Sequence, residues 1–493
     1  MCGICGFFNY SLKEYKKDER IDLSIESLAH RGPDDSGIFN SKTCNLSLAH
    51  SRLSILDLSS SGHQPFQSFN KEFFLVFNGE IYNYKELRNK VNKYYLKFEQ
   101  KKFVWKGQSD TEVLLEWFIV TQKQNKQIKN FLNTLDGIFA LAIWDEINKK
   151  LIVARDSFGV KPLYFFDDGE KFSFSSEIRA LYFLNNSLGE LDLLSIKRYL
   201  TYLWCPGDGT PLTGVKKISP GELLIIDKNH GLKKVFWYKL PAFKINSNIK
   251  LNLKKNTNTL FDNNQILIKQ TEEKLRNAVH KQLISDVEIG AFLSGGLDSS
   301  SIVKFAKEKI PNIKCFTIDN ECTSLNNRRD DLFYAKEVAK HLNLNIEIVK
   351  GDHNNLISSI EDMVLQLEEP LADPACLNVY YISKVARKYG IKVLLSGAGG
   401  DDLFSGYRRH LAVNNEKLWN WLPYPLRYLI NKSSDFLPTQ FQISRRVKKL
   451  FSGVHLDKEE RLLNYFSWID QTVLNDLFTP SVKNELEIYK VNA

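Results

Sequence analysis

The chain has 493 residues, of which 43% are hydrophobic and 25% charged, and its formal net charge is +9. These values are typical of a globular protein with two or more domains. Lysine is spread along the chain, no apolar run reaches transmembrane length, and the first residues lack a signal peptide, so we expect no nucleic acid partner, no membrane span and no secretion. Seven scattered cysteines indicate reduced thiols and a cytoplasmic location.

The first informative residue is Cys2. We expect Met1 to be removed, which would give Cys2 both a thiol and a free α-amine, and such an amine can act as the base for its own side chain. Cys2 and Cys5 also form a CxxC pair. A redox motif needs a strand ahead of it, and a zinc site needs a second ligand pair, and the sequence supplies neither. Taken alone, Cys2 is better explained as an incidental buried cysteine.

Polar motifs that contain glycine or charged residues follow, separated by apolar segments such as Phe73–Phe77 that predict strands. Asn78 and Gly79 directly follow that strand, and by themselves they are explained by a type I′ hairpin turn. The turn Arg31–Asp34 is interpreted as structural. The motifs are His30–Gly37, Ala49–Leu58, Phe77–Asn83 and Ser109–Glu112.

The next segments alternate like antiparallel strands, which predicts two packed sheets. They are Leu135–Asp145, Ala154–Tyr164 and Phe174–Ala180. Turn-rich sequence and short strands then occupy the start of residues 191–265. The stretch from Lys244 to Gln265 is rich in Asn, Lys and Thr, and it predicts a linker.

From Ile266 onward, short apolar strands alternate with helical patterns, which predicts a parallel sheet covered on both faces. Ligands should therefore lie at the carboxyl ends of its strands. The predicted strands are Val287–Leu293, Lys314–Ile318, Asn345–Val349 and Ile391–Leu395, and the predicted helices are Thr271–Leu283, Ser301–Ala306, Asp331–Leu342, Leu356–Leu367 and Leu377–Tyr389. Tyr424–Ala493 is expected to be helical and basic.

The turn SGGLDSS, residues 294–300, joins the first of these strands to a helix. Two adjacent glycines let the backbone come close to a ligand, and the helix N-terminus points N–H groups at an anion. We interpret this turn as a phosphate site. Asp298 would repel phosphate unless a cation such as Mg²⁺ lies between them. The absence of GxxxxGK[ST] excludes a P-loop kinase or GTPase.

A second loop follows the fourth strand, with the sequence SGAGGDD at residues 396–402. Its small residues again allow a ligand to approach the backbone, and Asp401 and Asp402 supply carboxylates. A GxGxxG dinucleotide site is excluded because Asp402 stands where the third glycine is required. An Asp-rich turn without ligand remains the alternative explanation.

Together these motifs resemble two families joined in one chain. The first half resembles the glutaminase domain of class II glutamine amidotransferases, and the whole resembles glutamine-dependent asparagine synthetases. The resemblance implies an α/β plus α+β fold class: an N-terminal Ntn-hydrolase domain with four αββα layers, then a parallel-sheet α/β domain of the PP-loop type. We place the glutaminase domain at residues 2–190, connecting strands and linker at 191–265, and the synthetase domain at 266–493.

For the glutaminase half, the resemblance implies that the Cys2 thiol attacks the glutamine amide. Arg52 would hold the α-carboxylate of glutamine, because a guanidinium fork suits a bidentate acceptor. Glu80 and Asp110 would hold the α-ammonium group. The Asn78 side chain and the Gly79 N–H would form the oxyanion hole.

For the synthetase half, the resemblance implies ATP and Mg²⁺ as cofactors. Asp298 and Asp401 would bind the metal ion, and Leu293 and Ile318 would line the adenine pocket. The full set of expected ATP-binding residues is Leu293, Ser294, Gly295, Gly296, Asp298, Ser299, Ser300, Ile318, Ser396 and Gly397.

The implied reaction is amidation of a carboxylate acceptor, L-aspartate by resemblance, with ammonia from L-glutamine, giving AMP, pyrophosphate and glutamate. Two features depart from the family. Ala398 stands where asparagine synthetases place an acidic residue, so another acceptor such as a sugar uronic acid stays open. No equivalent of the family's downstream lysine is found, so a truncated chain that keeps glutaminase activity or nucleotide binding without synthetase turnover also stays open. A homodimer is the expected assembly.

Overall fold

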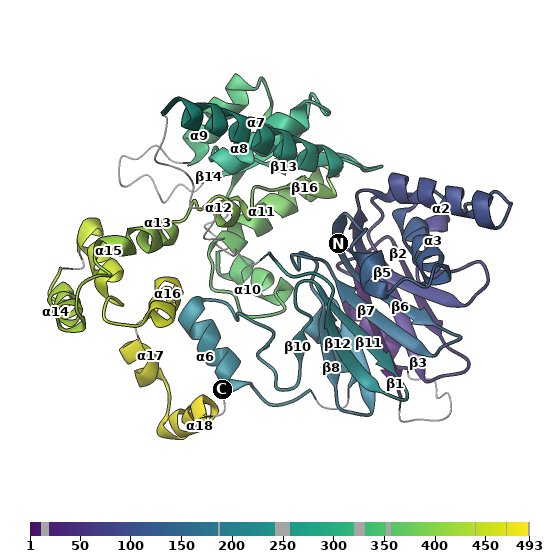
Figure 1. Ribbon diagram of the computed structural model, residues 1–493, viewed down its shortest axis with the longest axis horizontal. Coiled ribbons are helices and arrows are strands. Elements are labelled where there is room, and N and C mark those ends of the chain that lie inside the picture. The colour runs from purple at the N-terminus through teal and green to yellow at the C-terminus, as the bar shows by residue number, and fades with distance from the viewer. Residues whose placement is uncertain are drawn as a thin grey trace.

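The computed structural model describes residues 1–10, 19–185, 188–241, 257–319, 331–351, 356–438, 440–469 and 471–491. Figure 1 shows a β-rich part formed by the first half of the chain, a mixed α/β part, and a set of helices formed by the C-terminal residues.

Two six-stranded antiparallel sheets form the β-rich part. The first has the order β10-β8-β9-β1-β3-β2, and the second has the order β12-β11-β7-β6-β5-β4. The bounds in the first sheet are β1 Gly3–Asn9, β2 Asp35–Asn40, β3 Leu46–Arg52, β8 Tyr164–Asp167, β9 Lys171–Ser175 and β10 Lys216–Lys217. In the second they are β4 Phe66–Gln67, β5 Phe73–Ile81, β6 Gly137–Asp145, β7 Lys150–Arg155, β11 Glu222–Asp227 and β12 Gly231–Phe236.

Strand β1 shows how the period-two pattern places these sheets. Ile4 and Phe8 belong to a buried cluster shared with β5, β6 and β7, so they lie between the sheets. Cys5 and Phe7 belong to a different cluster that includes residues of two helices, so they lie on the outer face. Successive side chains of a strand point to opposite faces, and here both faces are buried.

Helices cover both outer faces of this sandwich. On the face of the first sheet lie α1 (Arg20–Ser27) and α5 (Ile178–Leu184). On the face of the second lie α2 (Tyr84–Phe98), α3 (Asp110–Lys123) and α4 (Ile128–Leu132). The predicted four-layer αββα arrangement is therefore confirmed. Strands β10, β11 and β12 come from the segment expected to connect the domains, and they complete these sheets; the domain boundaries themselves stay a prediction.

The mixed part contains a four-stranded parallel sheet with the order β15-β14-β13-β16. Its strands are β13 Ile289–Phe292, β14 Lys314–Asp319, β15 Ile346–Lys350 and β16 Val393–Leu395. The helices around it are α7 Thr257–Lys281, α8 Leu297–Lys307, α9 Asp331–His341, α10 Leu356–Gln366 and α11 Ala375–Lys388. Helices α7, α8 and α9 cover one face and α11 the other, which confirms the predicted parallel sheet.

The expected linker from Lys244 to Gln265 needs a correction. Residues 257–265 lie in α7, which extends to Lys281, and residues 244–256 lie outside the described residues. The C-terminal half of α7 places Leu275 and Val279 against the sheet. The residues whose packing stabilises α7 therefore lie in the part that was predicted to be helical.

The remaining helices connect and extend these parts. They are α6 Leu193–Tyr202, α12 Gly400–Leu403, α13 Arg408–Asn415, α14 Tyr424–Asp435, α15 Gln442–Phe451, α16 Lys458–Phe466, α17 Gln471–Leu477 and α18 Pro480–Val491, with short 3₁₀ turns at Ser60–Gly62 and Glu416–Leu418. Helical structure after Tyr424 is thus confirmed for the described residues. Among those residues, no helix combines the length and apolar character needed to cross a membrane.

Candidate active sites

One small cavity in the β-rich part brings together all the residues expected to act on glutamine. It has a volume of about 60 Å³ and lies at the start of β1, the end of β3, the end of β5 and the start of α3. The predicted residues among its lining are Cys2, Arg52, Asn78, Gly79, Glu80 and Asp110. Residues separated by more than one hundred positions in the sequence therefore surround a single thiol.

Cys2, just before β1, is held by contacts to its thiol and to its backbone. The backbone N–H of Leu53 donates to Cys2 Sγ at 3.4 Å, and Arg31 Nε donates to the Cys2 carbonyl at 3.0 Å. Burial raises the pKa of the Cys2 thiol, while the charges of Lys161 and Arg52 lower it. Arg31, from the turn that we interpreted as structural, thus fixes the backbone that carries the Cys2 thiol.

Arg52 ends β3 and is buried, with 5% of its surface exposed. Its guanidinium donates to the carbonyls of Ser59 at 2.9 Å, Leu56 at 3.3 Å and Asp57. These bonds hold the backbone of residues 56–59, of which Leu56 lines the cavity. At about 60 Å³ the cavity is well below the roughly 300 Å³ at which small-molecule pockets begin, and Ile55 and Leu56 are part of its lining.

Asn78 and Gly79 lie in β5 beside β6, so the hairpin-turn explanation is wrong. Asn78 is buried, and within the described chain its Nδ2 atom has no hydrogen-bond partner. A Cβ atom on Gly79 would lie 2.2 Å from the carbonyl oxygen of Ile138, so only glycine fits there. A buried amide donor without a hydrogen-bond partner costs free energy in the folded state. Such a donor can stabilise an anion that forms during a reaction.

Glu80 and Asp110 supply two carboxylates to the same cavity. Burial raises the pKa of Glu80 to about 7, with nearby Lys161 opposing the shift. Burial raises the pKa of Asp110 to about 6, although Asp110 accepts a hydrogen bond from the Ile81 N–H at 3.0 Å. A cationic ligand between these carboxylates would favour their ionised forms and so lower both pKa values.

The sequence did not single out Lys161, which lines this cavity and approaches both Cys2 and Glu80. Burial lowers the pKa of its ammonium group, and the negative charges of Glu80 and Cys2 oppose that shift. Lys161 lies in the turn between β7 and β8, where a lysine ordinarily faces solvent. Only the folding of the two sheets shows that it points inward.

The SGGLDSS turn has the predicted strand–turn–helix form. Strand β13 ends at Phe292, Gly296 caps α8, and Gly295 adopts a φ of +79° that favours glycine. A Cβ atom on Gly295 would also lie 2.4 Å from the Ala335 backbone nitrogen. Ser294 Oγ and Ser299 Oγ lie 3.0 Å apart across the turn. The turn therefore packs tightly against α9 and opens at the carboxyl end of the sheet.

The second loop packs directly against the first. A Cβ atom on Gly397 would lie 2.8 Å from the Ser299 nitrogen, and one on Gly400 would lie 2.4 Å from the Asp298 carboxylate. Asp401 follows Gly400, so the carboxylates of Asp298 and Asp401 belong to the first turns of two adjoining helices, α8 and α12. Within the described residues there is no cluster of three or more His, Cys, Asp or Glu side chains suited to a metal. Two carboxylates fit a Mg²⁺ ion that takes its other ligands from phosphate and water.

A cavity of about 390 Å³ lies between the carboxyl ends of β13 and β14 and helices α9 and α11. Leu293, Ser294 and Ile318 line it, as expected for an adenine pocket, and Phe316, Val379 and Ile382 add apolar surface. Of the other expected ATP-binding residues, Gly295, Gly296, Ser396 and Gly397 lie on the two loops, and Asp298, Ser299 and Ser300 lie in the first turn of α8. The cavity and loops thus form one site at the predicted edge of the sheet.

Several contacts join the two sites. The Asp57 N–H donates to Asp286 Oδ2 at 2.8 Å, and the Asp286 N–H donates to the Ile55 carbonyl at 2.9 Å. Asp286 stands three residues before β13. The segment from Ile55 to Asp57, which contributes Ile55 and Leu56 to the cavity lining, is therefore bonded to the chain that leads into the SGGLDSS turn.

A second set of contacts surrounds Glu369, between α10 and α11. Its carboxylate accepts from Tyr164 Oη at 2.9 Å and from Lys217 Nζ at 2.9 Å. Near the surface, Lys392 pairs with Asp34 at 2.7 Å. None of these interdomain contacts was predicted, because each joins residues more than one hundred positions apart.

Comparisons with known proteins agree with this division of the chain. The glutamine amidotransferase domain model matches residues 1–237, and the asparagine synthase model matches residues 270–480. A Methanocaldococcus jannaschii protein, named as a candidate glutamine-hydrolysing asparagine synthetase, is 30% identical over all of this chain and 91% of its own length. The chain belongs to the glutamine-hydrolysing asparagine synthetase family.

Other members of the family differ more in length and in name. Asparagine synthetase (glutamine-hydrolysing) 1 of Bacillus subtilis is 31% identical over 89% of this chain, and the chain spans 64% of that relative. A Gibberella zeae protein named amidase chry2 is 29% identical over 83% of this chain and 59% of its own length. The family thus includes proteins whose names do not specify asparagine.

Proposed function

We propose that this protein uses ATP to activate a carboxylate and amidates it with ammonia released from glutamine. The observation that carries the proposal is the convergence of five expected residues around Cys2, in the same chain as two glycine loops that meet at Asp298. Family membership supports the pairing of these two sites. The residue roles below are part of the proposal.

In the glutaminase site, the Cys2 sulfur attacks the glutamine side-chain carbonyl, and its proton passes to the departing nitrogen, which leaves as ammonia. The negative oxygen formed on attack lies within reach of the Asn78 Nδ2 donor and the Gly79 N–H. Water then cleaves the thioester, which gives glutamate and restores the thiol. Arg52 binds the α-carboxylate, and Glu80 and Asp110 bind the α-ammonium group.

In the synthetase site, an acceptor carboxylate oxygen attacks the α-phosphorus of ATP and displaces pyrophosphate. Ammonia then attacks the acyl carbon, AMP leaves, and an amide forms. The Ser294–Ser300 turn holds phosphate oxygens through its N–H groups and hydroxyls. Asp298 and Asp401 would hold Mg²⁺, which supplies positive charge to the pyrophosphate group.

The test is pyrophosphate and glutamate release with glutamine, ATP and a panel of carboxylates. We expect acceptor-dependent pyrophosphate release, with glutamine replaceable by ammonium. The Cys2→Ala variant should keep ammonium-dependent synthesis and lose glutamine use. Acceptor amidation that proceeds without ATP would contradict the proposal.

A specific observation favours an acceptor other than aspartate. Ala398, on the loop between Gly397 and Gly400, offers a methyl group where asparagine synthetases place an acid. In the acceptor panel, pyrophosphate release with aspartate alone would exclude this alternative.

A further inference from the structure

A buried group of charged side chains connects the backbone of Cys2 to the synthetase half. Its centre is Glu177, the residue before α5, of which only 1% is exposed. Glu177 Oε1 accepts a hydrogen bond from Arg31 Nη1 at 2.6 Å and lies 3.0 Å from His30 Nε2. Arg31 also donates from Nε to the Cys2 carbonyl at 3.0 Å. One oxygen of Glu177 therefore binds the arginine that holds the Cys2 backbone.

The other oxygen of Glu177 faces a contact with the synthetase half. Glu177 Oε2 lies 3.0 Å from Arg179 Nε. The same nitrogen donates to Glu368 Oε1 at 2.7 Å, and Arg179 Nη2 donates to the Leu365 carbonyl at 2.8 Å. Leu365 belongs to the last turn of α10, and Glu368 follows that helix. Arg179 thus pairs with one carboxylate from each half of the chain.

The Nε atom of Arg179 carries a single hydrogen, so it cannot donate equally to both carboxylates. Glu368 accepts this hydrogen, and within the described residues the buried Glu177 Oε2 atom has no hydrogen-bond partner. Burial and the charge of Glu177 raise the pKa of Glu368 to about 7. Burial would also raise the pKa of Glu177, but the hydrogen bond from His30 and the charge of Arg31 hold it below its usual range. Two carboxylates therefore compete for one N–H group, and Glu368 has it in this structure.

We propose that Arg179 is a positioning residue that makes glutamine hydrolysis depend on the place of residues 365–368 of the synthetase half. While these residues occupy the Arg179 N–H, Glu177 stays with Arg31 and the Cys2 backbone is held. When they move away, the N–H turns to Glu177 Oε2, which weakens the bond to Arg31 and loosens Cys2. A contact with two arrangements is the physical requirement for such coupling. The inference rests on the proposed function and adds how its first site is controlled.

Glu368→Gln tests this control directly. A neutral amide competes weakly for an arginine, so the N–H should turn to Glu177. We expect the kcat for glutamine hydrolysis to fall about threefold or more, as for the loss of one hydrogen bond. The KM for glutamine should stay unchanged, because Arg31 is not among the residues that line the Cys2 cavity. Glu361→Gln, at an exposed position of α10, should match the wild type. An unchanged kcat in Glu368→Gln would overturn the inference.

Removal of Arg179 supplies a rescue that a purely structural role does not produce. Glu368 acts on Glu177 through Arg179, so Arg179→Met combined with Glu368→Gln should return kcat to within about twofold of the wild-type value. Independent structural damage would instead accumulate in the double variant. A double variant no faster than Glu368→Gln alone would overturn the inference.

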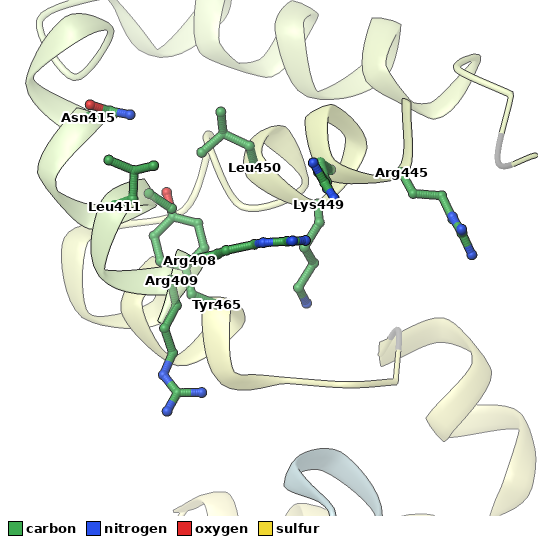
Figure 2. A pocket seen from close by; sticks show the side chains of 10 residues that line it. Arg408, Arg409, Leu411, Asn415, Arg445, Lys449, Leu450 and Tyr465 are labelled. Atoms are coloured by element: carbon green, nitrogen blue, oxygen red, sulfur yellow. The ribbon is translucent and has the colours of Figure 1, made fainter. Parts of the chain in front are cut away.

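Arg445→Met is the matched control for the loss of an arginine. Arg445 is exposed on α15, at a hollow between α13, α15 and α16, and Figure 2 shows its side chain pointing away from the other labelled residues. This variant should leave the kcat for glutamine hydrolysis unchanged, and it should not rescue Glu368→Gln. Rescue by Arg445→Met would show that the effect does not pass through Arg179.

Alkylation of Cys2 separates this inference from the proposed function. Its rate with iodoacetamide, followed by mass spectrometry of the N-terminal peptide, needs no turnover. We expect Cys2 of Glu368→Gln to react about threefold or more faster than that of the wild type, because a loosened backbone exposes the thiol. If the wild type hydrolyses no glutamine but this difference is found, the proposed function fails and the inference stands. If glutamine is hydrolysed and both kcat and alkylation rate match, the proposed function stands and the inference fails.

Discussion

At the scale of single residues, charge inside the Cys2 cavity is set by burial. Burial removes water from both Glu80 and Asp110, and it raises their pKa values to about 7 and about 6. The two groups expected to bind the α-ammonium of glutamine are thus partly protonated until that cation arrives. Glutamine affinity and protein stability should respond to pH in opposite directions.

Glu80→Gln tests this relation. The unfolded chain releases the Glu80 proton near pH 4.5 and the folded chain holds it to about pH 7, so the free energy of unfolding should fall as pH rises across that window. Between pH 5 and pH 8, the free energy of unfolding should fall by about 2 kcal/mol less in the variant than in the wild type. It should also raise the KM for glutamine.

Thermal denaturation at the two pH values measures the first effect, and glutamate release measures the second. Glu86→Gln, at an exposed position of α2, is the control and should match the wild type in both. An identical pH dependence of stability in Glu80→Gln and the wild type would contradict the assignment of the proton to Glu80.

Lys161 offers a second prediction. Its ammonium charge lowers the pKa values of the Cys2 thiol and of Glu80, against the larger opposing effect of burial. Lys161→Met should therefore reduce glutamine hydrolysis at pH 7 by about tenfold or more and shift the rise in activity to higher pH. Lys161→Arg should keep most of the activity, and ammonium-dependent synthesis should be unchanged in both variants. A pH profile of Lys161→Met that matches the wild type would refute this role.

At the scale of elements, apolar residues that repeat every two or every 3.6 positions were enough to predict the sandwich, the parallel sheet and the turn before α8. The predicted strand at 314–318 and helix at 331–342 differ from β14 and α9 by one residue at one end. The first turns of α7 were missed because Asn and Thr are weak helix formers, and composition alone indicates a linker there. Packing of Leu275 and Val279 stabilises the helix in a way that local sequence does not reveal.

The two glycines of the SGGLDSS turn provide a matched pair at this scale. Gly295 has a positive φ and no room for a Cβ atom, whereas a Cβ atom on Gly296 would meet only Ser294 Oγ, at 3.4 Å. We expect Gly295→Ala to destabilise the protein by about 2 kcal/mol or more and to abolish ATP-dependent pyrophosphate release. Gly296→Ala should cost about 1 kcal/mol or less in stability.

Thermal shift measures the two stabilities, and glutamate release shows that the glutaminase half stays intact in both variants. Equal stability losses for Gly295→Ala and Gly296→Ala would contradict the described packing against α9.

At the scale of the molecule, the two halves are joined by contacts of unequal strength. Glu369 is mostly buried and holds both Tyr164 and Lys217, while Lys392 and Asp34 keep about a third of their side chains exposed. Removing one partner of a buried pair is far more costly than removing one partner of an exposed pair. The sequence could not indicate this difference, because it depends on which residues the interface excludes from water.

Glu369→Ala should therefore separate the two activities. We expect a loss of about 3 kcal/mol in stability and more glutamate formed per pyrophosphate released, since the halves no longer stay aligned. Lys392→Ala should change stability by about 1 kcal/mol or less and leave that ratio near the wild-type value. Simultaneous assays of glutamate and pyrophosphate provide the ratio; an unchanged ratio in Glu369→Ala would show that this contact does not align the halves.

The position of Ile55 and Leu56 in the lining of the Cys2 cavity has a consequence for the order of events. Glutamine needs more space than about 60 Å³, so we expect the cavity lining to open before glutamine binds. The same short segment is bonded through Ile55 and Asp57 to Asp286, just ahead of β13. We therefore predict that glutamine binding shifts the chain ahead of β13 before ammonia is released, and that a shift of β13 on ATP binding would in turn change the affinity for glutamine.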